Sequence, residues 1–554
     1  MPEFCNDLTG KISRLRFNKG EEIAFIAVPT PILMEGDKVL SPNRTNYFPI
    51  SQLTLATSLK KRLEKENIPW NVTFSDFKSL ENIDTWDKKL SDYGEVKYAD
   101  KRLTKCVIGN GMGRIKNELP DKNIICITAN FTFEANVIKN VIHLIKRENK
   151  NCIIILGGKD ASARPEFYLS HGADIIASGD ADLTLPELIC RLYRGKMLDD
   201  ILKDGILRNT NYIDINELPL LDLSLIKNTF HRYIESGGGG FLDSITKKGN
   251  TAYFESSRGC YRECDFCTER LSQFSEMYLD RYLEEVNWYK KNNVHTIMFI
   301  DDNMMLRMDG KPAGERNLFE MFDYLRKQNM VWEFPIGLEV GQFMDAQRNR
   351  IKDLLLEVMF WNNDSIKDFS GAFRMLFPIE NLLTGEEQGE NLSKMRSLED
   401  NMKILAMIIS KGIPQVNLGI MIGWAADNKQ KIGNLEKSID QIRRYCEHIN
   451  SNSTRMIKTA VNYSIFCTTP LPGTPLYQQM LKEKRIKYAI ETDSELWNLY
   501  TSVLEGDCFK SHEITSLRQD LLTLFHSQHE SGKVKLHLFS NDINSENIST
   551  PFKN

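Results

Sequence analysis

The chain has 554 residues, with 71 lysine or arginine and 75 aspartate or glutamate residues, so its formal net charge is only −4. Such a balance gives no global field for nucleic acid or an anionic membrane surface, and neither partner is expected. The length exceeds what one hydrophobic core supports, and roughly three units are expected. No stretch approaches the roughly 18 apolar residues of a membrane span, and the N-terminus lacks a signal-peptide profile, so we expect a cytoplasmic protein.

The first part of the chain alternates short β-branched runs with helical patterns. The predicted strands are 23–28, 70–74, 106–108, 124–128, 152–156 and 174–177, and the predicted helices are 51–66, 134–147 and 183–193. This alternation is typical of an α/β domain with a doubly wound parallel sheet, as in flavodoxin-like and Rossmann-like folds. We assign this domain to residues 1–210.

Small residues follow three of these strands, at the sheet edge where open α/β folds bind their ligands. The candidate contacts are Thr128, Asn130, Gly157, Gly158, Ser178, Gly179 and Asp180. Glycine allows a ligand to approach the backbone, and Thr, Ser and Asn offer neutral hydrogen bonds. A simple turn is the alternative for the glycine pair. No G-x-G-x-x-G follows the first strand, so a dinucleotide is the less favoured guest.

Residues 211–250 contain four consecutive glycines at 237–240 and are predicted to be a linker or a gating loop. Beyond them, strand patterns at 252–255, 296–300, 331–337, 415–422 and 461–467 accompany helical patterns at 279–292, 316–328 and 398–411. These units predict a full or partial (β/α) barrel over 251–481, with functional loops at the strand carboxyl ends. Residues 482–554 are predicted to be a small, mostly helical segment, with helices at 495–504 and 517–525 and a polar tail.

The densest chemical signal is a polar loop that carries Cys260, Cys264 and Cys267 within eight residues. Thiolates bind soft metal centres, and three of them leave one iron of a four-iron cubane without a protein ligand. A structural zinc site is the alternative, although no cysteine or histidine nearby supplies an obvious fourth ligand. The other eight cysteines are scattered, which fits a reducing compartment better than a disulfide framework.

The spacing C-x-x-x-C-x-aromatic-C, with Phe266 at the aromatic position, resembles the signature of radical S-adenosylmethionine (SAM) enzymes. The resemblance implies that Cys260, Cys264 and Cys267 hold a 4Fe-4S cluster whose open iron chelates the amino and carboxylate groups of SAM. It also implies that Phe266 contributes to binding this cofactor.

Further segments match that family in part. Asp302 and Asn303 stand where the family orients the methionine amine, and Glu339 stands where a polar side chain reaches the ribose. Residues 419–423, which end at Gly423, resemble the G-x-I-x-G-x-x-E strand that lies along the adenine. Alanine replaces the final glutamate of that motif, which puts its polar contact in doubt.

The first half, followed directly by the cysteine loop, is similar to the cobalamin-binding domain that precedes the barrel in one large class of radical SAM enzymes. The segments 156–166, 172–174 and 178–182 carry this similarity. The resemblance implies that the seven strand-end residues named above contact cobalamin. The motif D-x-H-x-x-G is absent, so the cobalamin is expected to lack a protein histidine ligand.

The resemblance implies a methyltransferase that acts on an unactivated carbon of a small metabolite or peptide-like natural-product precursor. SAM cleavage would supply a 5′-deoxyadenosyl radical, methylcobalamin would supply the methyl group, and an external donor such as flavodoxin or ferredoxin would supply electrons. Two alternatives stay open. One is a cobalamin-dependent rearrangement, ring contraction or oxidation without methyl transfer. The other is a non-catalytic cobalamin carrier with a zinc-stabilised second domain.

Overall fold

The computed structural model describes residues 10–11, 22–36, 38–40, 47–79, 90–109, 111–196, 198, 200–209, 213–233, 249–309, 311–345, 350–365, 367–380 and 398–527. These residues form two compact units. The first unit contains the described residues up to Tyr233 together with Tyr488–Asn498, and the second contains those of 249–487 and 499–527. The domain boundaries given above stay predictions, and the return of Tyr488–Asn498 to the first unit is a feature they did not include.

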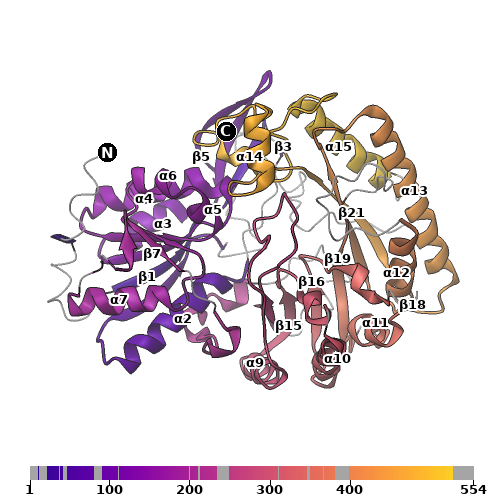
Figure 1. Cartoon of the computed structure of the whole chain (residues 1–554), viewed down its shortest axis with the longest axis horizontal. Coiled ribbons are helices and arrows are strands. Elements are labelled where there is room, and N and C mark those ends of the chain that lie inside the picture. The colour runs from indigo at the N-terminus through magenta and orange to yellow at the C-terminus, as the bar shows by residue number, and fades with distance from the viewer. Residues whose placement is uncertain are drawn as a thin grey trace, which may run out of the picture. The chain divides into compact units, whose positions relative to one another are not determined.

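The first unit is built on a seven-stranded sheet with the order β10-β11-β9-β8-β7-β1-β4 (Figure 1). Its strands are β1 (Glu22–Ala27), β4 (Asn71–Asp76), β7 (Ile124–Thr128), β8 (Ile153–Gly157), β9 (Ile175–Ser178), β10 (Leu202–Lys203) and β11 (Ile206–Arg208). All neighbours pair in parallel except β10 with β11. The predicted parallel α/β architecture is therefore confirmed for this unit.

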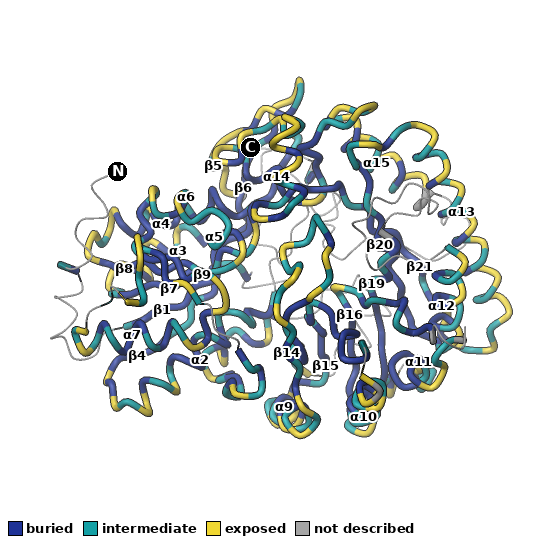
Figure 2. The backbone as a smooth tube through the Cα atoms, in the orientation of Figure 1, coloured by how far each residue is buried: buried dark blue, intermediate teal, exposed yellow. Residues whose placement is uncertain are grey.

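Helices cover both faces of this sheet because its strands are apolar on both sides. One face packs on α2 (Ile50–Lys65) and α7 (Thr184–Arg194). The other face packs on α3 (Gly111–Glu118), α4 (Ala135–Glu148), α5 (Lys159–Ala163) and α6 (Pro165–Ser170). Within β7, Ile125 and Ile127 enter one core while Ile124 and Cys126 enter the other. Figure 2 shows the resulting pattern of buried strands and helices that are exposed along one side.

A second, four-stranded sheet in this unit has the order β3-β2-β6-β5 and is antiparallel throughout. Its strands are β2 (Pro31–Glu35), β3 (Lys38–Val39), β5 (Leu90–Tyr98) and β6 (Lys101–Ile108). The predicted strand 106–108 is the end of β6, and its place in the parallel sheet was wrong. A β-branched run identifies a strand but does not select its partner.

The second unit is built on six parallel strands whose order in the sheet is their order along the chain. They are β12 (Asn250–Phe254), β15 (Val294–Phe299), β16 (Val331–Phe334), β19 (Gly371–Glu380), β20 (Gln415–Ile422) and β21 (Ala460–Cys467). Helices α9 (Leu279–Lys291), α10 (Pro312–Lys327), α11 (Asp353–Phe360), α12 (Leu398–Ser410) and α13 (Lys429–Asn452) connect successive strands. The strand order is open, with β12 and β21 at its ends, which corresponds to a partial β/α barrel.

Shorter elements complete the second unit. They are β13 (Ser257–Arg258), β14 (Ser275–Glu276), β17 (Met344–Asp345), β18 (Arg350–Ile351), α14 (Pro475–Lys482) and α15 (Ser511–Ser527). Helix α15 confirms the helix predicted at 517–525, whereas the helix predicted at 495–504 was wrong. That stretch contains only the 3₁₀ turn η8 (Ser494–Leu496).

The glycine run 237–240 and the tail from 528 onward lie outside the described residues. Among the helices that are described, none is long and apolar enough to cross a membrane.

Candidate functional site

The cysteine loop leaves β12 and is closed at its base by a short antiparallel ladder between β13 and β14. Within it, the Cys260 amide donates to Ser272 Oγ at 2.7 Å, and the Ser272 amide donates back to the Cys260 carbonyl at 3.0 Å. Cys260 and Cys264 are buried, and Cys267 is partly exposed. The loop is thus a defined turn whose ends are fixed by backbone hydrogen bonds.

Gly259 makes this turn possible. Its φ of +86° lies in the left-handed region, and a Cβ atom there would stand 2.0 Å from the carbonyl oxygen of Gln273. No residue with a side chain fits such an approach without moving the backbone. The position directly before Cys260 is therefore restricted to glycine by the loop itself.

Two N–H groups point toward the cysteine sulfurs. The Glu269 amide lies 3.4 Å from Cys267 Sγ, and Asn303 Nδ2 lies 3.8 Å from Cys260 Sγ. Donors of this kind stabilise a thiolate and tune a metal centre bound to it. The donor set of the loop fits a thiolate-bound cluster in its chemistry.

No group of three or more His, Cys, Asp or Glu side chains that could hold a metal ion is found in the part of the chain that the structure describes. That statement includes the three cysteines of the loop. Their assignment as cluster ligands stays a prediction.

The loop after β15 supplies three neighbouring polar side chains to the cysteine loop. Asp301 is buried and accepts hydrogen bonds from Ser256 Oγ and Ser257 Oγ, both at 2.6 Å. Asp302 accepts from the Gly259 amide at 2.7 Å. Burial raises the pKa of Asp301, and the two serine hydroxyls act against that rise. Both carboxyl groups hold the start of the cysteine loop against the strand ends.

Asn303 and Glu339 are in direct contact. Asn303 Nδ2 donates to Glu339 Oε2 at 2.8 Å, in addition to its contact with Cys260. Asn303 Oδ1 is buried and has no hydrogen-bond partner among the described residues. A buried carbonyl oxygen of this kind is a vacant acceptor at the strand ends.

Arg262 lies between the first two cysteines and was not predicted to belong to the site. Its guanidinium donates to both carboxylate oxygens of Glu339, at 2.8 and 3.1 Å, and pairs with Asp309 at 3.0 Å. Only 7% of the Glu339 side chain is exposed, so this bidentate pair is largely desolvated. Glu339 therefore holds the cysteine loop through Arg262. The resemblance implied only a contact between Glu339 and the ribose.

The end of β20 meets the cysteine loop through an aromatic contact. The ring of Phe266 lies edge-on to that of Trp424, with centroids 5.8 Å apart and an angle of 75°. The amides of Gly423 and Trp424 donate to the buried Asp427 carboxylate at 2.8 and 3.0 Å. Burial raises the pKa of Asp427, which these two amides partly counteract. Asp427 thus shapes the turn that follows the predicted adenine strand.

In the first unit, the predicted strand-end residues lie side by side. Parallel register aligns Thr128 with Gly157, and Gly157 with Ala177, so the loops after β7, β8 and β9 are neighbours. The Ala129 amide donates to the Gly157 carbonyl at 2.7 Å, and the Gly179 amide contacts Ser162 Oγ at 3.4 Å. Asn209 donates to the carbonyl of Asp180. The structure therefore brings Thr128, Asn130, Gly157, Gly158, Ser178, Gly179 and Asp180 to one edge of the sheet.

The packing of the chain itself requires glycine at position 158. Its φ is +108°, and a Cβ atom would stand 2.5 Å from Asn130 Oδ1 and 2.6 Å from the Ala129 carbonyl oxygen. The glycine therefore allows the loops after β7 and β8 to touch. This requirement exists without any ligand.

Asp160, the second residue of α5 directly after β8, was also not predicted to belong to the site. It is buried and accepts hydrogen bonds from Thr132 Oγ1 at 2.7 Å, Tyr168 OH at 2.6 Å and the Arg164 guanidinium at 2.6 and 3.1 Å. The Arg164 charge and these donors make a buried carboxylate tolerable. Asp160 thereby joins the loops after β7 and β8 through side chains as well as backbone.

No protein-family profile matches the chain. It is 23% identical over 345 residues to an uncharacterized methyltransferase of Synechocystis, an alignment that covers 60% of this chain and 52% of that relative. It is 24% identical over 189 residues to the cobalamin-dependent radical SAM methyltransferase TokK of Streptomyces tokunonensis, covering 32% of this chain and 26% of TokK. The chain thus spans about half or less of the length of these curated relatives.

Among solved structures, the fold is similar to that of the radical SAM methyltransferase TsrM from Kitasatospora setae, solved with cobalamin and a [4Fe-4S] cluster. The TM-score is 0.52 at 12% sequence identity, and the alignment covers 85% of this chain and 76% of TsrM. A second TsrM structure contains tryptophan substrate and a SAM analogue. These comparisons confirm the predicted resemblance to cobalamin-dependent radical SAM enzymes.

Proposed function

We propose that this chain is a cobalamin-dependent radical SAM methyltransferase that acts on a carbon atom of a small metabolite or peptide-like precursor. The observation that carries the proposal is the contact network of Cys260, Asn303, Glu339 and Arg262. It joins the cysteine loop to two residues that sequence resemblance had separately assigned to the same cofactor. The similarity in sequence and fold to methyltransferases of this kind supports it.

In this proposal, Cys260, Cys264 and Cys267 hold the cluster. When bound, the cluster supplies the electron that cleaves SAM, and cobalamin supplies the transferable methyl group. Asn303 Oδ1 is suited to accept a hydrogen bond from the methionine amine, because it is a buried acceptor without a partner among the described residues. Phe266 and Trp424 offer an apolar aromatic corner beside the end of β20 for the adenine.

The same proposal assigns one cofactor-binding role to each unit. The first unit would be the cobalamin-binding domain, with the corrin at the loops after β7, β8 and β9 and without a histidine ligand. These loops carry small residues and short polar side chains, which let a large ligand approach the backbone and form neutral hydrogen bonds. The second unit would be the radical SAM barrel, supplied with electrons by a flavodoxin or ferredoxin.

Anaerobic reconstitution tests the cluster. The wild-type chain is expected to bind about four iron and four sulfide per chain, as one cubane requires. A triple variant with alanine at the three loop cysteines is expected to bind none and to leave SAM intact. The exposed Cys508 provides a matched control, since Cys508→Ala should retain the full iron content. A triple variant that still cleaves SAM would contradict the proposal.

Methyl-labelled SAM tests the reaction. With cobalamin present, the label is expected to appear in the bound cobalamin and then in the product. A product that forms without label would instead indicate a rearrangement or an oxidation. One equivalent of zinc and no iron would favour the non-catalytic carrier.

A further inference from the structure

The first unit contains a segment that comes from far along the chain. Tyr488–Asn498, here called the arm, packs with the described residues up to Tyr233, although Lys487 and Leu499 on either side belong to the second unit. At its centre, η8 contacts β2, the first turns of α4 and the 3₁₀ turn η2 (Thr132–Glu134). This arrangement was not predicted, because the arm lies in the segment 482–554, which was expected to be small and mostly helical.

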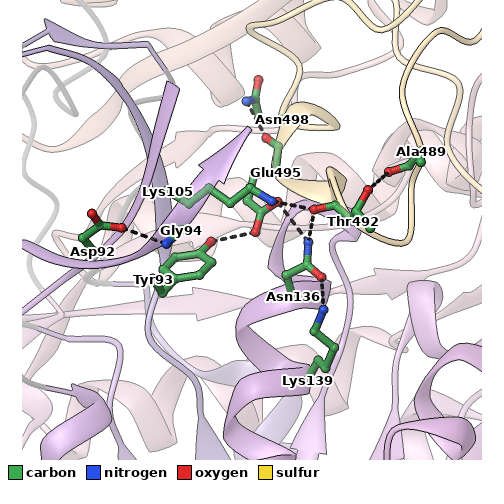
Figure 3. A network of polar contacts seen from close by, with 10 residues as sticks. All are labelled: Asp92, Tyr93, Gly94, Lys105, Asn136, Lys139, Ala489, Thr492, Glu495 and Asn498. Atoms are coloured by element: carbon green, nitrogen blue, oxygen red, sulfur yellow. Dashed lines mark hydrogen bonds and ion pairs between the residues drawn. The ribbon is translucent and has the colours of Figure 1, made fainter. Parts of the chain in front are cut away.

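One buried carboxylate, Glu495, holds the arm in place (Figure 3). It accepts hydrogen bonds from Tyr93 OH at 2.8 Å and Asn136 Nδ2 at 3.1 Å, and it pairs with Lys105 Nζ at 3.1 Å. The exposed fractions of the Glu495 and Lys105 side chains are only 2% and 8%. Removing one partner of such a desolvated pair strongly lowers the free energy of unfolding, because the other charge would stay buried alone.

Two further contacts extend this attachment along the arm. Asn136 Nδ2 also donates to the Thr492 carbonyl at 2.9 Å. Tyr488 stacks on Tyr98, with ring centroids 5.2 Å apart and an angle of 26°. The arm is thus attached at its first residue and through its centre.

Asn136 connects the arm to the loops that carry the predicted cobalamin contacts. It is the second residue of α4, and the loop that leads into α4 contains Thr128, Asn130 and Thr132. Thr132 donates to Asp160 directly after β8, and the Asp160 amide donates to the Ala129 carbonyl at 3.0 Å. The contact of Asn136 with Glu495 and that of Thr132 with Asp160 therefore lie four residues apart on the segment that enters α4.

We propose that the arm is a structural part of the cobalamin site and that Glu495 is a positioning residue for it. By fixing the start of α4, Glu495 holds the loops after β7 and β8 in the conformation that receives the corrin. This inference rests on the proposed function. It adds that a segment beyond the barrel strands is needed for cofactor binding by the N-terminal unit.

The test is the affinity of the full-length, anaerobically purified chain for hydroxocobalamin, followed by its visible spectrum. Glu495→Gln keeps the size of the side chain but leaves Lys105 without its counter-charge. We expect the half-saturating cobalamin concentration to rise about tenfold, as for other residues that orient a cofactor's ligands. Amide exchange across residues 128–136 should accelerate, whereas iron and sulfide content should not change.

A matched control lies on the same arm. Glu491 is exposed, so Glu491→Gln makes the same chemical change without breaking a buried pair, and the half-saturating concentration should stay within twofold of wild type. Adding Lys105→Gln to Glu495→Gln removes the uncompensated lysine and should restore most of the affinity. Urea unfolding of the single and double variants is measured beside the affinity, because removing the buried lysine charge also restores stability. A loss of affinity that only follows the unfolded fraction would refute the positioning role.

The outcomes separate the two proposals. If the wild-type chain binds cobalamin and the folded Glu495→Gln variant binds it equally well, the role of the arm is refuted while the proposed function stands. If the wild-type chain binds no cobalamin, the proposed function fails and this inference fails with it. Should Glu495→Gln not fold, Tyr93→Phe removes one hydrogen bond to the same carboxylate. It is then expected to weaken binding twofold to threefold, and no change would refute the role of the arm.

Discussion

The cysteine loop of the second unit and the strand-end loops of the first are held by different forces. Ionised side chains hold the cysteine loop, chiefly the Arg262–Glu339 pair. The strand-end loops are held largely by backbone contacts, such as the Ala129 amide on the Gly157 carbonyl, and by the absence of a side chain at Gly158. A single neutral substitution at Arg262 can therefore loosen the cysteine loop. One added methyl group at Gly158 can disturb the contact between the loops after β7 and β8.

The largest effect is expected from the buried charges of the second unit. Arg374 on β19 donates to both carboxylate oxygens of Glu333 on β16, at 2.7 and 2.8 Å, and each side chain is only 1% exposed. Glu333→Gln should lower the free energy of unfolding by about 3–5 kcal/mol, because the arginine charge stays buried without its partner. Urea unfolding followed by tryptophan fluorescence measures this.

The control is an ion pair of the same unit in an exposed position. Arg316 pairs with Glu320 on α10, and the arginine side chain is 81% exposed. Glu320→Gln should change the free energy of unfolding by less than about 0.5 kcal/mol. If Glu333→Gln and Glu320→Gln lower the free energy of unfolding equally, burial does not determine how much these ion pairs contribute to stability.

The second prediction concerns the backbone contacts of the first unit. Gly158→Ala should lower the free energy of unfolding by about 2–3 kcal/mol, since it combines a positive φ with a steric conflict. Gly94 also has a positive φ, but a Cβ atom there meets nothing within 4 Å. Gly94→Ala should therefore reduce stability by only about 1 kcal/mol. If both variants lose equal stability, the close approach of the two loops is not what requires Gly158.

The third prediction tests the charge-held loop directly. Arg262→Gln removes the bidentate pair with Glu339, and the reconstituted cluster should lose iron to a chelator about tenfold faster. Arg270 lies in the same loop but reaches Asp265 only at 4.0 Å. Arg270→Gln should release iron at nearly the wild-type rate. Identical rates for both variants would exclude Arg262 as the anchor of the loop.

The smallest effect is a pH dependence of the second unit's stability. Burial raises the pKa of Glu285 on α9 from 4.5 to about 7, although Arg281 acts against the rise. Between these values the folded chain binds more protons than the unfolded chain, so this group's contribution to stability falls as pH rises and stays low above pH 7. Glu285→Gln should therefore stabilise the chain at pH 8 and have little effect on its stability at pH 4.5. A constant difference across that range would contradict the assignment.

Most parallel strands of both units could be predicted because their buried faces leave continuous apolar runs. The predicted strands 124–128 and 415–422 have the same bounds as β7 and β20. The parallel strands β11 and β19 were not predicted. In contrast, β5 has the sequence LSDYGEVKY, and most of its side chains are at least partly exposed. Without an apolar run it gave no strand signal, so the antiparallel sheet was missed.

Helix α13 was overlooked although its signal was present. Its buried residues are Ile432, Leu435, Ile439, Ile442 and Cys446. Their spacing of three or four residues is that of an amphipathic helix. The polar residues between them concealed it.

The candidate site also contains residues that could be predicted from the sequence and residues that could not. The three cysteines, Asn303 and Glu339 could be predicted as candidate site residues because they lie in short sequence motifs, and their roles stay predictions. The roles of Arg262, Asp160 and Glu495 depend on partners that lie 28 to 402 residues away along the chain. No local pattern carries such information, since it arises only when distant segments fold together.

The return of the arm to the first unit has a consequence for synthesis. The first unit receives the arm only after Lys487 has left the ribosome, so the order of folding cannot simply follow the order of translation. Until the arm has been synthesised, Asn136 on α4 and Lys105 on β6 lack their contact with Glu495. A truncated chain that ends before the arm would lack Glu495, the ion-pair partner of Lys105. We expect chaperones to bind such a chain.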